Sequence, residues 1–330
     1  MVGLTSQQTE LDNKALLASA QLIGVDWGST GLRAFLINQH GALLETRTAQ
    51  LGASAMQSVD AYSATLNQLI GDWMALNQDG KKLPILACGM VGSKHGWLDV
   101  PYVECPADAN TIANNLGFIV DHAVHIVPGL IFYSDNAVPD IMRGEETQII
   151  GALESYPYLS HEACLILPGT HSKWAQIKQG QITGFATHMT GELFSVLRQY
   201  SVLGRLLSSS AETHDPAAFV AGVEAARDDA HLGLSHQLFA VRSLGVTEKM
   251  DGTALADYLS GLLIGYEIKA GLAWRKLAGL NYSPLVLVGE PELCQRYETA
   301  LLSFAQTPSL LLPNTAPVGL WNIALAAKLV

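Results

Sequence analysis

Five consecutive residues, DWGST from Asp26 to Thr30, have the composition of a phosphate-binding turn. An acidic side chain that ends a buried strand just before a glycine turn can hold a magnesium ion close to phosphates. Gly28 lets backbone N–H groups approach phosphate oxygens, while Ser29 and Thr30 add hydroxyl donors. An ordinary hairpin turn could have the same composition, so this run alone leaves both interpretations open.

A second loop, PGTHSKW from Pro168 to Trp174, contains more catalytic side-chain types. Lys173 could offset the charge that develops on a transferred phosphoryl group, and Thr170 could donate a hydrogen bond to it. His171 could accept the proton of a hydroxyl group. A lone histidine is usually structural or on the surface, but within this loop a catalytic or phosphate-binding role is an equal alternative.

The run MRGEETQ, from Met142 to Gln148, places a cation and two carboxylates at the expected start of a helix. Arg143 could bind a substrate carboxylate or phosphate, and Glu145 or Glu146 could act as a base or metal ligand. Acidic residues in a first turn also favour the helix dipole without any chemical role. Both interpretations stay open.

Two further segments have the composition of substrate contacts. CGMVGSKHGW, from Cys88 to Trp97, follows a strand and combines glycines with Lys94 and an aromatic side chain, as a substrate-recognition loop would. It could equally be an exposed connection. Glu192, in TGEL, opens a helix, where it could be a site residue or only a favourable charge.

The two candidate phosphate loops lie in two copies of one layout. From Leu22 to Ile37 the sequence predicts a strand, a small-residue turn and a second strand, and a third strand follows in ALLETRTA. From Cys164 to Lys178 it predicts the same strand, loop and strand, followed by QITGFATHM. The repetition predicts two related halves. Two such turns facing one another across a cleft would form a phosphate clamp.

Helices and strands alternate between and after these copies. We expect a helix over 58–76, a strand over 83–90, a mostly helical region over 189–280 and a closing helix over 317–330. The alternation favours an α/β fold. No GxxxxGKS/T loop and no GxGxxG after a strand is present, which excludes the two commonest nucleotide-binding motifs.

The chain has 330 residues, of which 49% are hydrophobic and 15% charged, so it can form two packed cores. We predict a polar lead-in over residues 1–20, an N-terminal domain over 21–150 that contains the first loop and the substrate loops, and a C-terminal domain over 151–330 that contains the second loop.

The overall charge restricts the partners. A net charge of −11 disfavours nucleic acid and membrane surfaces, which need clustered Lys and Arg. A few convergent basic side chains could still bind an anionic small molecule. The four cysteines have no CxxC pair or metal-like spacing, and the first residues lack a signal-peptide pattern. We therefore expect a cytoplasmic protein with reduced thiols.

Six blocks of sequence, in this order and spacing, resemble the 2-dehydro-3-deoxygalactonokinase family, which has an actin-like ATPase fold. The resemblance covers nearly all of the chain from Leu22 to Val330. The blocks are DWGST at 26–30, GMVGSKHGW at 89–97, PYVECPA at 101–107, MRGEETQIIGAL at 142–153, LPGTHSKW at 167–174 and MTGELF at 189–194.

The resemblance implies two actin-like (ribonuclease H-like) domains with mixed sheets around an ATP cleft. The phosphate loops would be Asp26–Thr30 and Gly169–Lys173, and Gly289 would contact the adenosine. The wider superfamily often has a glycine pair where this chain has Gly289 and Glu290, so the adenine contacts are not settled by the motif.

A second departure concerns the catalytic base. Related sugar kinases often have an aspartate in the second phosphate loop, whereas this loop contains His171 and no carboxylate. His171 could replace it, or one of four carboxylates could reach the hydroxyl instead. These are Asp26, Glu145, Glu146 and Glu192.

The implied reaction transfers the γ-phosphoryl group of ATP to the 6-hydroxyl of 2-dehydro-3-deoxy-D-galactonate in D-galactonate catabolism. Magnesium, held by Asp26, and Lys173 would stabilise the transferred charge. Arg33 or Arg143 would bind the carboxylate of the acid. Alternatives are a kinase for another sugar or sugar acid, a nucleotide-switched regulator on the same scaffold, and a catalytically idle homologue. The sequence leaves the oligomeric state open, with a homodimer among the options.

Overall fold

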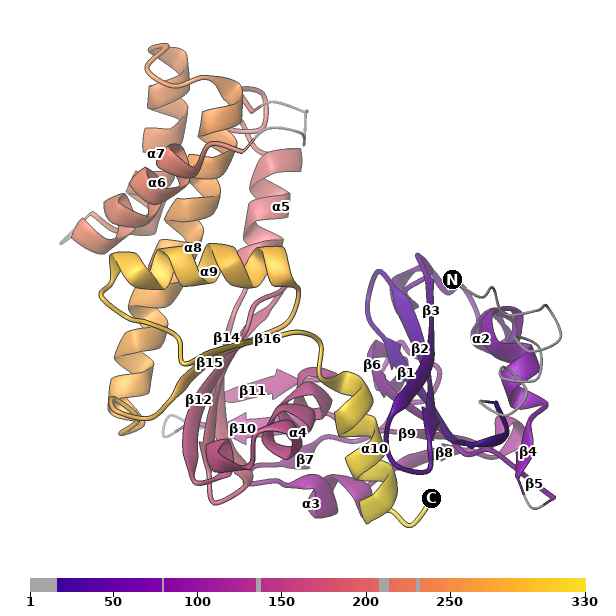
Figure 1. The fold of residues 1–330 in the computed structure, drawn as a ribbon. Helices are drawn as coiled ribbons and strands as arrows, with labels where there is room; N and C mark the ends of the chain where they lie inside the picture. The colour runs from indigo at the N-terminus through magenta and orange to yellow at the C-terminus, as the bar shows by residue number, and fades with distance from the viewer. Residues whose placement is uncertain (1–16, 79, 135–137, 208–213, 230–231) are drawn as a thin grey trace, which may run out of the picture. The chain divides into compact units, whose positions relative to one another are not determined.

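The chain forms two compact units, which Figure 1 shows as a ribbon. This computed structural model describes residues 17–78, 80–134, 138–207, 214–229 and 232–330. Most of the predicted polar lead-in, up to residue 16, lies outside the described residues. Unit 1 comprises the chain up to Ser160 with residues 180–183 and 314–330, and unit 2 comprises residues 161–179 and 184–313.

Unit 1 is built on a six-stranded mixed sheet with the order β3-β2-β1-β6-β9-β8. β1 pairs antiparallel with β2 and parallel with β6. The strands of this sheet are β1 (Ala20–Trp27), β2 (Leu32–Asn38), β3 (Leu43–Ala49), β6 (Ile85–Gly89), β8 (Gly117–Ile119) and β9 (Val124–Ile126). Its helices are α2 (Val59–Met74), α3 (Ala109–Ala113), α4 (Glu145–Ser155) and α10 (Ala316–Ala326).

Shorter elements complete unit 1. A three-stranded sheet has the order β11-β10-β7, and β4 and β5 form a two-stranded sheet. These strands are β4 (Asn77–Gln78), β5 (Lys81–Lys82), β7 (Val103–Glu104), β10 (Leu130–Tyr133) and β11 (Pro139–Met142). The 3₁₀ turns are η1 (Ala53–Ala55), η2 (Met90–Gly92), η3 (Val120–His122) and η4 (Pro157–Ser160).

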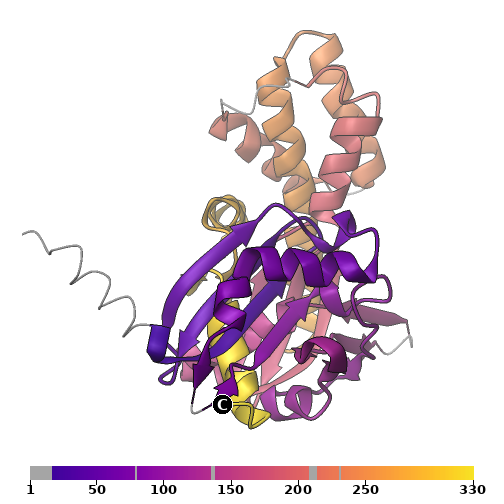
Figure 2. The ribbon, with the colours of Figure 1, turned by 90° about the vertical axis from the view of Figure 1, so that its right-hand side faces the viewer.

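Side chains of β1 alternate between the two faces of the sheet. Ile23 and Val25 belong to the core that includes residues of α2, and Figure 2 shows α2 lying across this sheet. Gly24 faces the other way, where a Cβ atom on it would lie 3.0 Å from Leu320 of α10. By the same alternation, Asp26 lies on the α10 face of the strand.

The division of the chain differs from the single boundary that the sequence predicted near residue 150. The contacts divide it after Ser160 and return residues 314–330 to unit 1, because α10 packs along α4. Glycine allows the two helices to approach closely: a Cβ atom on Gly319 would lie 1.9 Å from the carbonyl oxygen of Thr147.

Unit 2 repeats the strand arrangement of unit 1. Its sheet has the order β14-β13-β12-β15-β16, which matches β3-β2-β1-β6-β9 position by position. The central strand of each sheet pairs antiparallel on one side and parallel on the other: β1 with β2 and β6, and β12 with β13 and β15. The strands are β12 (Glu162–Leu167), β13 (Ser172–Lys178), β14 (Gln181–His188), β15 (Leu285–Val288) and β16 (Leu310–Leu312). This confirms the predicted α/β fold with mixed sheets and two related halves.

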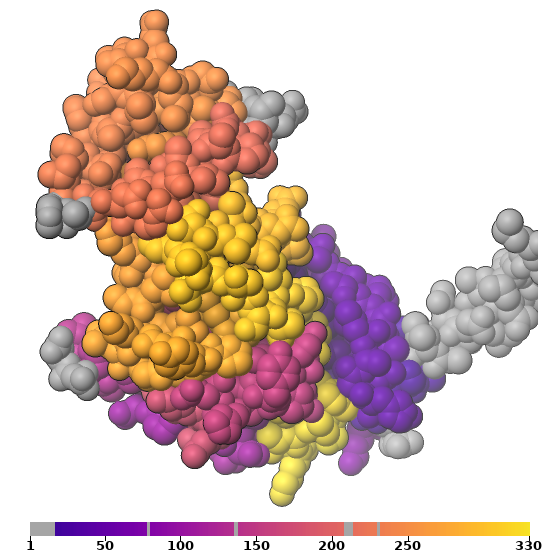
Figure 3. Space-filling model, turned by 60° about the vertical axis from the view of Figure 1, so that its left-hand side comes forward, coloured from indigo at the N-terminus to yellow at the C-terminus, as the bar shows by residue number. Residues whose placement is uncertain are grey.

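The remainder of unit 2 is helical, as predicted. Its helices are α5 (Thr190–Tyr200), α6 (Pro216–Asp228), α7 (Gly233–Val246), α8 (Gly252–Leu277) and α9 (Pro291–Ser303). α6 and α8 touch through glycines, since a Cβ atom on Gly261 would lie 2.0 Å from the carbonyl oxygen of Phe219. On the face shown in Figure 3, α9 in yellow borders α6 in salmon. Within the described ranges, no helix has the length and apolar character needed to span a membrane.

Candidate active site

The turn between β1 and β2 has a backbone fixed by a neighbouring loop. Gly28 donates its N–H to the carbonyl oxygen of Gly31 at 2.9 Å, and Ala53 donates to the carbonyl oxygen of Gly28 at 2.9 Å. The backbone N–H and the hydroxyl group of Ser54 both donate to the carbonyl oxygen of Ser29, at 3.1 and 2.5 Å. Ser29 and Thr30 themselves are exposed, so their side chains can meet a ligand.

Asp26 ends β1 directly before this turn. Burial raises the pKa of Asp26, and the charge of Arg33 and hydrogen bonds with Asn314 and Cys88 act in the opposite direction. Arg33 faces Asp26 across the β1–β2 pair, and its side chain is exposed. One carboxylate beside a fixed glycine turn suits magnesium, which usually takes one or two carboxylates and completes its shell with phosphates and water. Among the described residues, no cluster of three or more His, Cys, Asp or Glu could hold a metal by itself.

Two glycines bring the start of α4 to the end of β6. Gly89 has φ of +89°, and a Cβ atom there would lie 2.6 Å from the carbonyl oxygen of Trp27. Gly144 has φ of +107°, and its Cβ position would lie 3.2 Å from Cα of Gly89. Only glycine adopts these conformations at such close range without strain. The predicted MRGEETQ segment therefore lies beside the ends of β1 and β6.

The two carboxylates of α4 differ in their surroundings. Oε2 of Glu145 accepts a hydrogen bond from the backbone N–H of Arg143 at 3.1 Å. Oε2 of Glu146 accepts from the N–H of Gly144 at 2.7 Å, and its Oε1 accepts from the Thr147 hydroxyl at 3.0 Å. Glu146 has no exposed surface, and burial followed by the charge of Glu145 raises its pKa to about 8. Burial therefore disfavours the charged form of Glu146.

Arg143 is buried, with 8% of its surface exposed. Its Nη2 donates to the carbonyl oxygen of Val100 at 2.7 Å, and its guanidinium carbon lies 4.4 Å from the ring centre of Tyr102. Its Nε and Nη1 are buried without a hydrogen-bond partner among the described residues. Gly92 leaves room for this group, because a Cβ atom there would lie 2.8 Å from Nη1. Either of these two donors could bind one oxygen of a carboxylate.

The predicted substrate loop presents one of its two named side chains to solvent. Lys94 is exposed, whereas Trp97 is only 6% exposed. The Trp97 ring stacks on Tyr62 at 5.8 Å between ring centres and meets Trp27 edge-on at 6.3 Å. Trp97 thus packs in the core of unit 1, and its contact with a substrate stays a prediction.

The second loop joins β12 to β13 in unit 2. Thr170 and His171 are exposed at its tip, while Ser172 and Lys173 are buried where β13 begins. The N–H of Gly169 donates to Oγ of Ser172 at 3.4 Å. The loop therefore offers polar groups at its tip and anchors its base in the protein.

The start of α5 packs against this loop. A Cβ atom on Gly191 would lie 2.5 Å from the carbonyl oxygen of Gly169. The N–H of Glu192 donates to the carbonyl oxygen of Thr170 at 3.0 Å, and the Glu192 carboxylate is hydrogen-bonded to Nε2 of His171. The structure thus brings together two predicted site residues, His171 and Glu192, from separate motifs.

Gly289 follows β15 and lies beside the same loop. It has φ of +146°, and a Cβ atom on it would lie 3.8 Å from the carbonyl oxygen of Pro168. Its N–H donates to the carbonyl oxygen of Leu312 at 3.0 Å. Glu290 then caps α9 by accepting from the N–H of Leu293 at 3.1 Å. The position predicted to contact adenosine is therefore within reach of the second loop.

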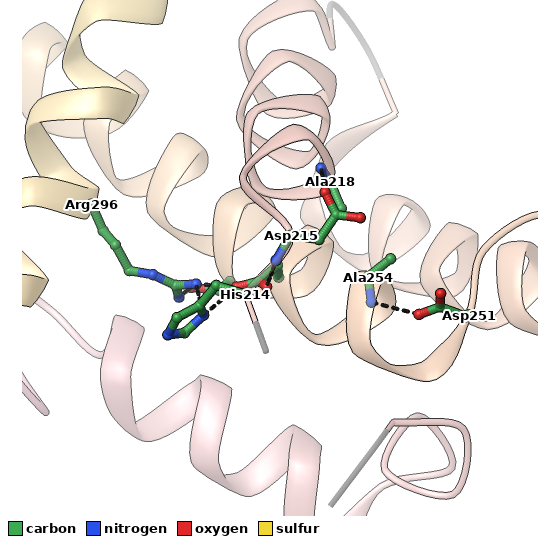
Figure 4. Close-up of polar contacts among 8 residues, drawn as sticks. His214, Asp215, Ala218, Asp251, Ala254 and Arg296 are labelled. Carbon is green, nitrogen blue, oxygen red and sulfur yellow. Dashed lines mark hydrogen bonds and ion pairs between the residues drawn. The ribbon is translucent and has the colours of Figure 1, made fainter. Parts of the chain in front are cut away.

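A pocket of about 540 Å³ opens along α9, on the same unit. Its walls include Phe219 from α6 and Leu293 and Arg296 from α9. The guanidinium carbon of Arg296 lies 5.0 Å from the ring centre of Phe219, and its Nη2 lies 3.2 Å from Nδ1 of His214, as Figure 4 shows for the latter pair. This pocket could not be predicted from sequence motifs, because its walls come from separate helices.

The family of the chain follows from comparison with known proteins. The family model described as 2-keto-3-deoxy-galactonokinase matches residues 26–323, which include both candidate loops and Gly289. The chain belongs to this family. The resemblance predicted from six sequence blocks is therefore confirmed.

Named relatives agree with this assignment. The Escherichia coli (strain K12) 2-dehydro-3-deoxygalactonokinase is 34% identical over 308 residues, which cover 93% of this chain and 98% of the relative. A Rhizobium meliloti (strain 1021) protein named "probable 2-dehydro-3-deoxygalactonokinase" is 36% identical over 286 residues, which cover 84% of this chain and 88% of the relative.

A solved structure shares the fold. The crystal structure of a Sinorhizobium meliloti protein assigned to the same activity superposes with a TM-score of 0.79 at 31% identity. The alignment covers 92% of this chain and 98% of that one. The similarity thus extends over both units rather than one domain.

Proposed function

We propose that the protein is an ATP-dependent kinase that phosphorylates the 6-hydroxyl of 2-dehydro-3-deoxy-D-galactonate. The observation that carries this proposal is the family match, which runs from Asp26 almost to the end of the chain and includes every candidate motif. The relatives named for this activity are matched over nearly their whole length. The product would be the 6-phosphate of the acid, together with ADP.

In this proposal both glycine loops bind the phosphates of ATP. Ser29 and Thr30 are exposed on the first loop, and Thr170 is exposed on the second. Lys173 offsets the charge of the transferred group. Asp26 would hold magnesium, which when bound neutralises the phosphate oxygens that develop negative charge.

The pocket along α9 is our candidate for the adenine. Its volume of about 540 Å³ is that of a small-molecule site, and it begins at Glu290, directly after Gly289. Phe219 and Leu293 provide apolar surface for a flat ring, and Arg296 can stack on it. In this proposal these side chains would contact the adenine in a chain that lacks the glycine pair of the wider superfamily.

The pair of His171 and Glu192 is our candidate for the catalytic base. Glu192 fixes Nε2 of His171, so the imidazole can keep a proton on Nε2 and present the lone pair of Nδ1. That lone pair would take the proton of the 6-hydroxyl as its oxygen attacks the γ-phosphorus. Glu145 and Asp26 stay as alternative acceptors.

Arg143 is our candidate for the carboxylate of the acid. Its Nε and Nη1 are two donors without a partner among the described residues, and either could donate to one oxygen of a carboxylate. Lys94, exposed on the loop that Arg143 anchors through Val100, could contact the hydroxyl groups.

A cytoplasmic location and a homodimer stay predictions.

A coupled assay of ADP release tests the proposal. The purified protein would receive ATP and magnesium with 2-dehydro-3-deoxy-D-galactonate, with the gluconate-derived epimer, or with no acceptor. We expect turnover that depends on an acceptor and is fastest with the galactonate-derived acid. Preference for another acid would replace the substrate assignment, and ADP release without any acceptor would favour a nucleotide-switched regulator.

A further inference from the structure

A buried chain of hydrogen bonds connects the second loop with three helices of unit 2. Its centre is the hydroxyl group of Tyr297 on α9, which donates to Oε2 of Glu267 on α8 at 2.6 Å. The same hydroxyl lies 2.8 Å from Oγ of Ser172 and is also hydrogen-bonded to Thr190 at the start of α5. Ser172, Glu267 and Tyr297 are each at most 3% exposed. These polar groups are therefore satisfied by one another rather than by solvent.

The direction of each bond follows from the donors available. A carboxylate accepts only, so Tyr297 gives its one proton to Glu267. The oxygen of Tyr297 must then accept from the hydroxyl groups of Ser172 and Thr190. Oγ of Ser172 in turn accepts from the backbone N–H of Gly169 at 3.4 Å. This series of hydrogen bonds runs from the backbone of the loop to a buried carboxylate, and each bond polarises the next.

The same carboxylate fixes the other side of Lys173. Nε1 of Trp174 donates to Oε1 of Glu267 at 3.0 Å. Lys173 lies between Ser172 and Trp174, and both neighbours are bound to Glu267, the first through Tyr297 and the second directly. The backbone of the lysine is thus held on both sides by one buried network.

We infer that Tyr297 is a positioning residue for phosphoryl transfer, whose hydroxyl group holds the loop from Gly169 to Lys173 in the conformation that binds the phosphates of ATP. The inference rests on the proposed kinase function. It concerns the hydroxyl group alone, because phenylalanine would fill the same volume in the core. The bond to Thr190 extends the effect to the start of α5, where Glu192 contacts His171.

The test compares Tyr297→Phe with a matched loss of a hydroxyl group elsewhere in unit 2. The hydroxyl of Tyr266 on α8 also donates to a carboxylate, that of Asp229, and this bond involves no residue of the loop. Both full-length variants would be compared with the wild type in urea unfolding, in steady-state kinetics for ATP and for the acid, and in calorimetric binding of a non-hydrolysable ATP analogue.

We expect Tyr297→Phe to lower kcat/KM for ATP by about tenfold or more, because displacing a catalytic loop by a fraction of an ångström weakens transition-state contacts. The KM for the acid should stay within about twofold of the wild type in Tyr297→Phe, because the acid's carboxylate is assigned to Arg143. Both kcat/KM for ATP and the KM for the acid should stay within about twofold in Tyr266→Phe, since its bond to Asp229 involves no residue of the loop. A kcat/KM for ATP within twofold of the wild type in Tyr297→Phe, or an equal loss in the two variants, would overturn the inference.

A double-mutant cycle separates positioning from general destabilisation. Ser172→Ala breaks the link between Tyr297 and the loop, so the double variant should lose little more kcat/KM for ATP than Tyr297→Phe alone. A double variant whose loss of kcat/KM for ATP equals the product of the two single-variant losses would contradict the inference. Should the wild type show no acceptor-dependent turnover, the proposed function fails while this inference is still tested: weaker analogue binding by Tyr297→Phe than by Tyr266→Phe supports it, and equal binding overturns it.

Discussion

The imidazole of His171 is hydrogen-bonded to the carboxylate of Glu192. A backbone hydrogen bond joins the same two segments, because the N–H of Glu192 donates to the carbonyl oxygen of Thr170 at 3.0 Å. A glycine contact between Gly191 and Gly169 holds the two segments together. The arrangement orients the exposed histidine from two directions, as a catalytic base requires.

If His171 is the base, His171→Ala should lower kcat by about a hundredfold, which is typical for the loss of a general base. Glu192→Gln should cost less, about tenfold, because it acts through the orientation of His171. The double variant should resemble His171→Ala. Steady-state kinetics would check this, with His161→Ala, an exposed histidine outside the loop, as control. Nearly wild-type kcat in His171→Ala would move the role to Glu145 or Asp26.

Asp26→Asn tests the magnesium site. Removing the carboxylate should lower kcat at least about a hundredfold, because the metal provides several kcal/mol of charge stabilisation in the transition state. The magnesium concentration for half-maximal turnover should rise. Asp72→Asn is the matched control, since that carboxylate is exposed and pairs with Arg47 in the same unit. An unchanged magnesium response in Asp26→Asn would contradict the assignment.

Arg143→Lys tests the carboxylate site while keeping the positive charge. Lysine has one ammonium group in place of the separate Nε and Nη1 donors, so we expect the KM for the acid to rise by about tenfold or more, the effect of one lost charge-assisted hydrogen bond. The KM for ATP should not change. Arg33→Lys, measured beside it, separates the two candidates that the sequence left open. An increase only in Arg33→Lys would transfer the carboxylate to Arg33.

Glu146 predicts a specific dependence of stability on pH. Its pKa is raised from the ordinary 4.5 to about 8, so between these values the folded state binds a proton that the unfolded state releases. Its contribution to stability is complete below pH 4.5 and is lost as the pH rises toward 8, at about 1.4 kcal/mol per pH unit. The free energy of unfolding, measured by urea denaturation at pH values between about 5.5 and 7.5, should decline more steeply with pH for the wild type than for Glu146→Gln. Parallel declines would contradict this.

Local sequence patterns were sufficient for the doubled fold. Each half begins with strands whose apolar residues and glycine turn lie within a short stretch, so the antiparallel pairs at β1–β2 and β12–β13 could be predicted without long-range information. The position of α10 could not be predicted, because its place beside α4 depends on a contact between Gly319 and Thr147, far apart in the chain.

The candidate site shows the same limit. DWGST and PGTHSKW are continuous motifs and could be found directly in the sequence. The surroundings and charge state of other candidate residues depend on their burial, which the sequence does not show. Trp97 resembles a substrate contact in sequence, but its partners Tyr62 and Trp27 place it in the core. Neighbouring Glu145 and Glu146 look equivalent in sequence, yet burial of Glu146 raises its pKa to about 8. Tyr297 had no motif at all.

The most direct test of the central proposal is the structure of the product. After incubation of the protein with ATP, magnesium and 2-dehydro-3-deoxy-D-galactonate, ³¹P and ¹H NMR of the purified product would locate the phosphate. We predict a single phosphomonoester whose phosphorus couples to the two protons on C6 of the acid. An acid that remains unphosphorylated, or one phosphorylated at another hydroxyl, would contradict the proposal.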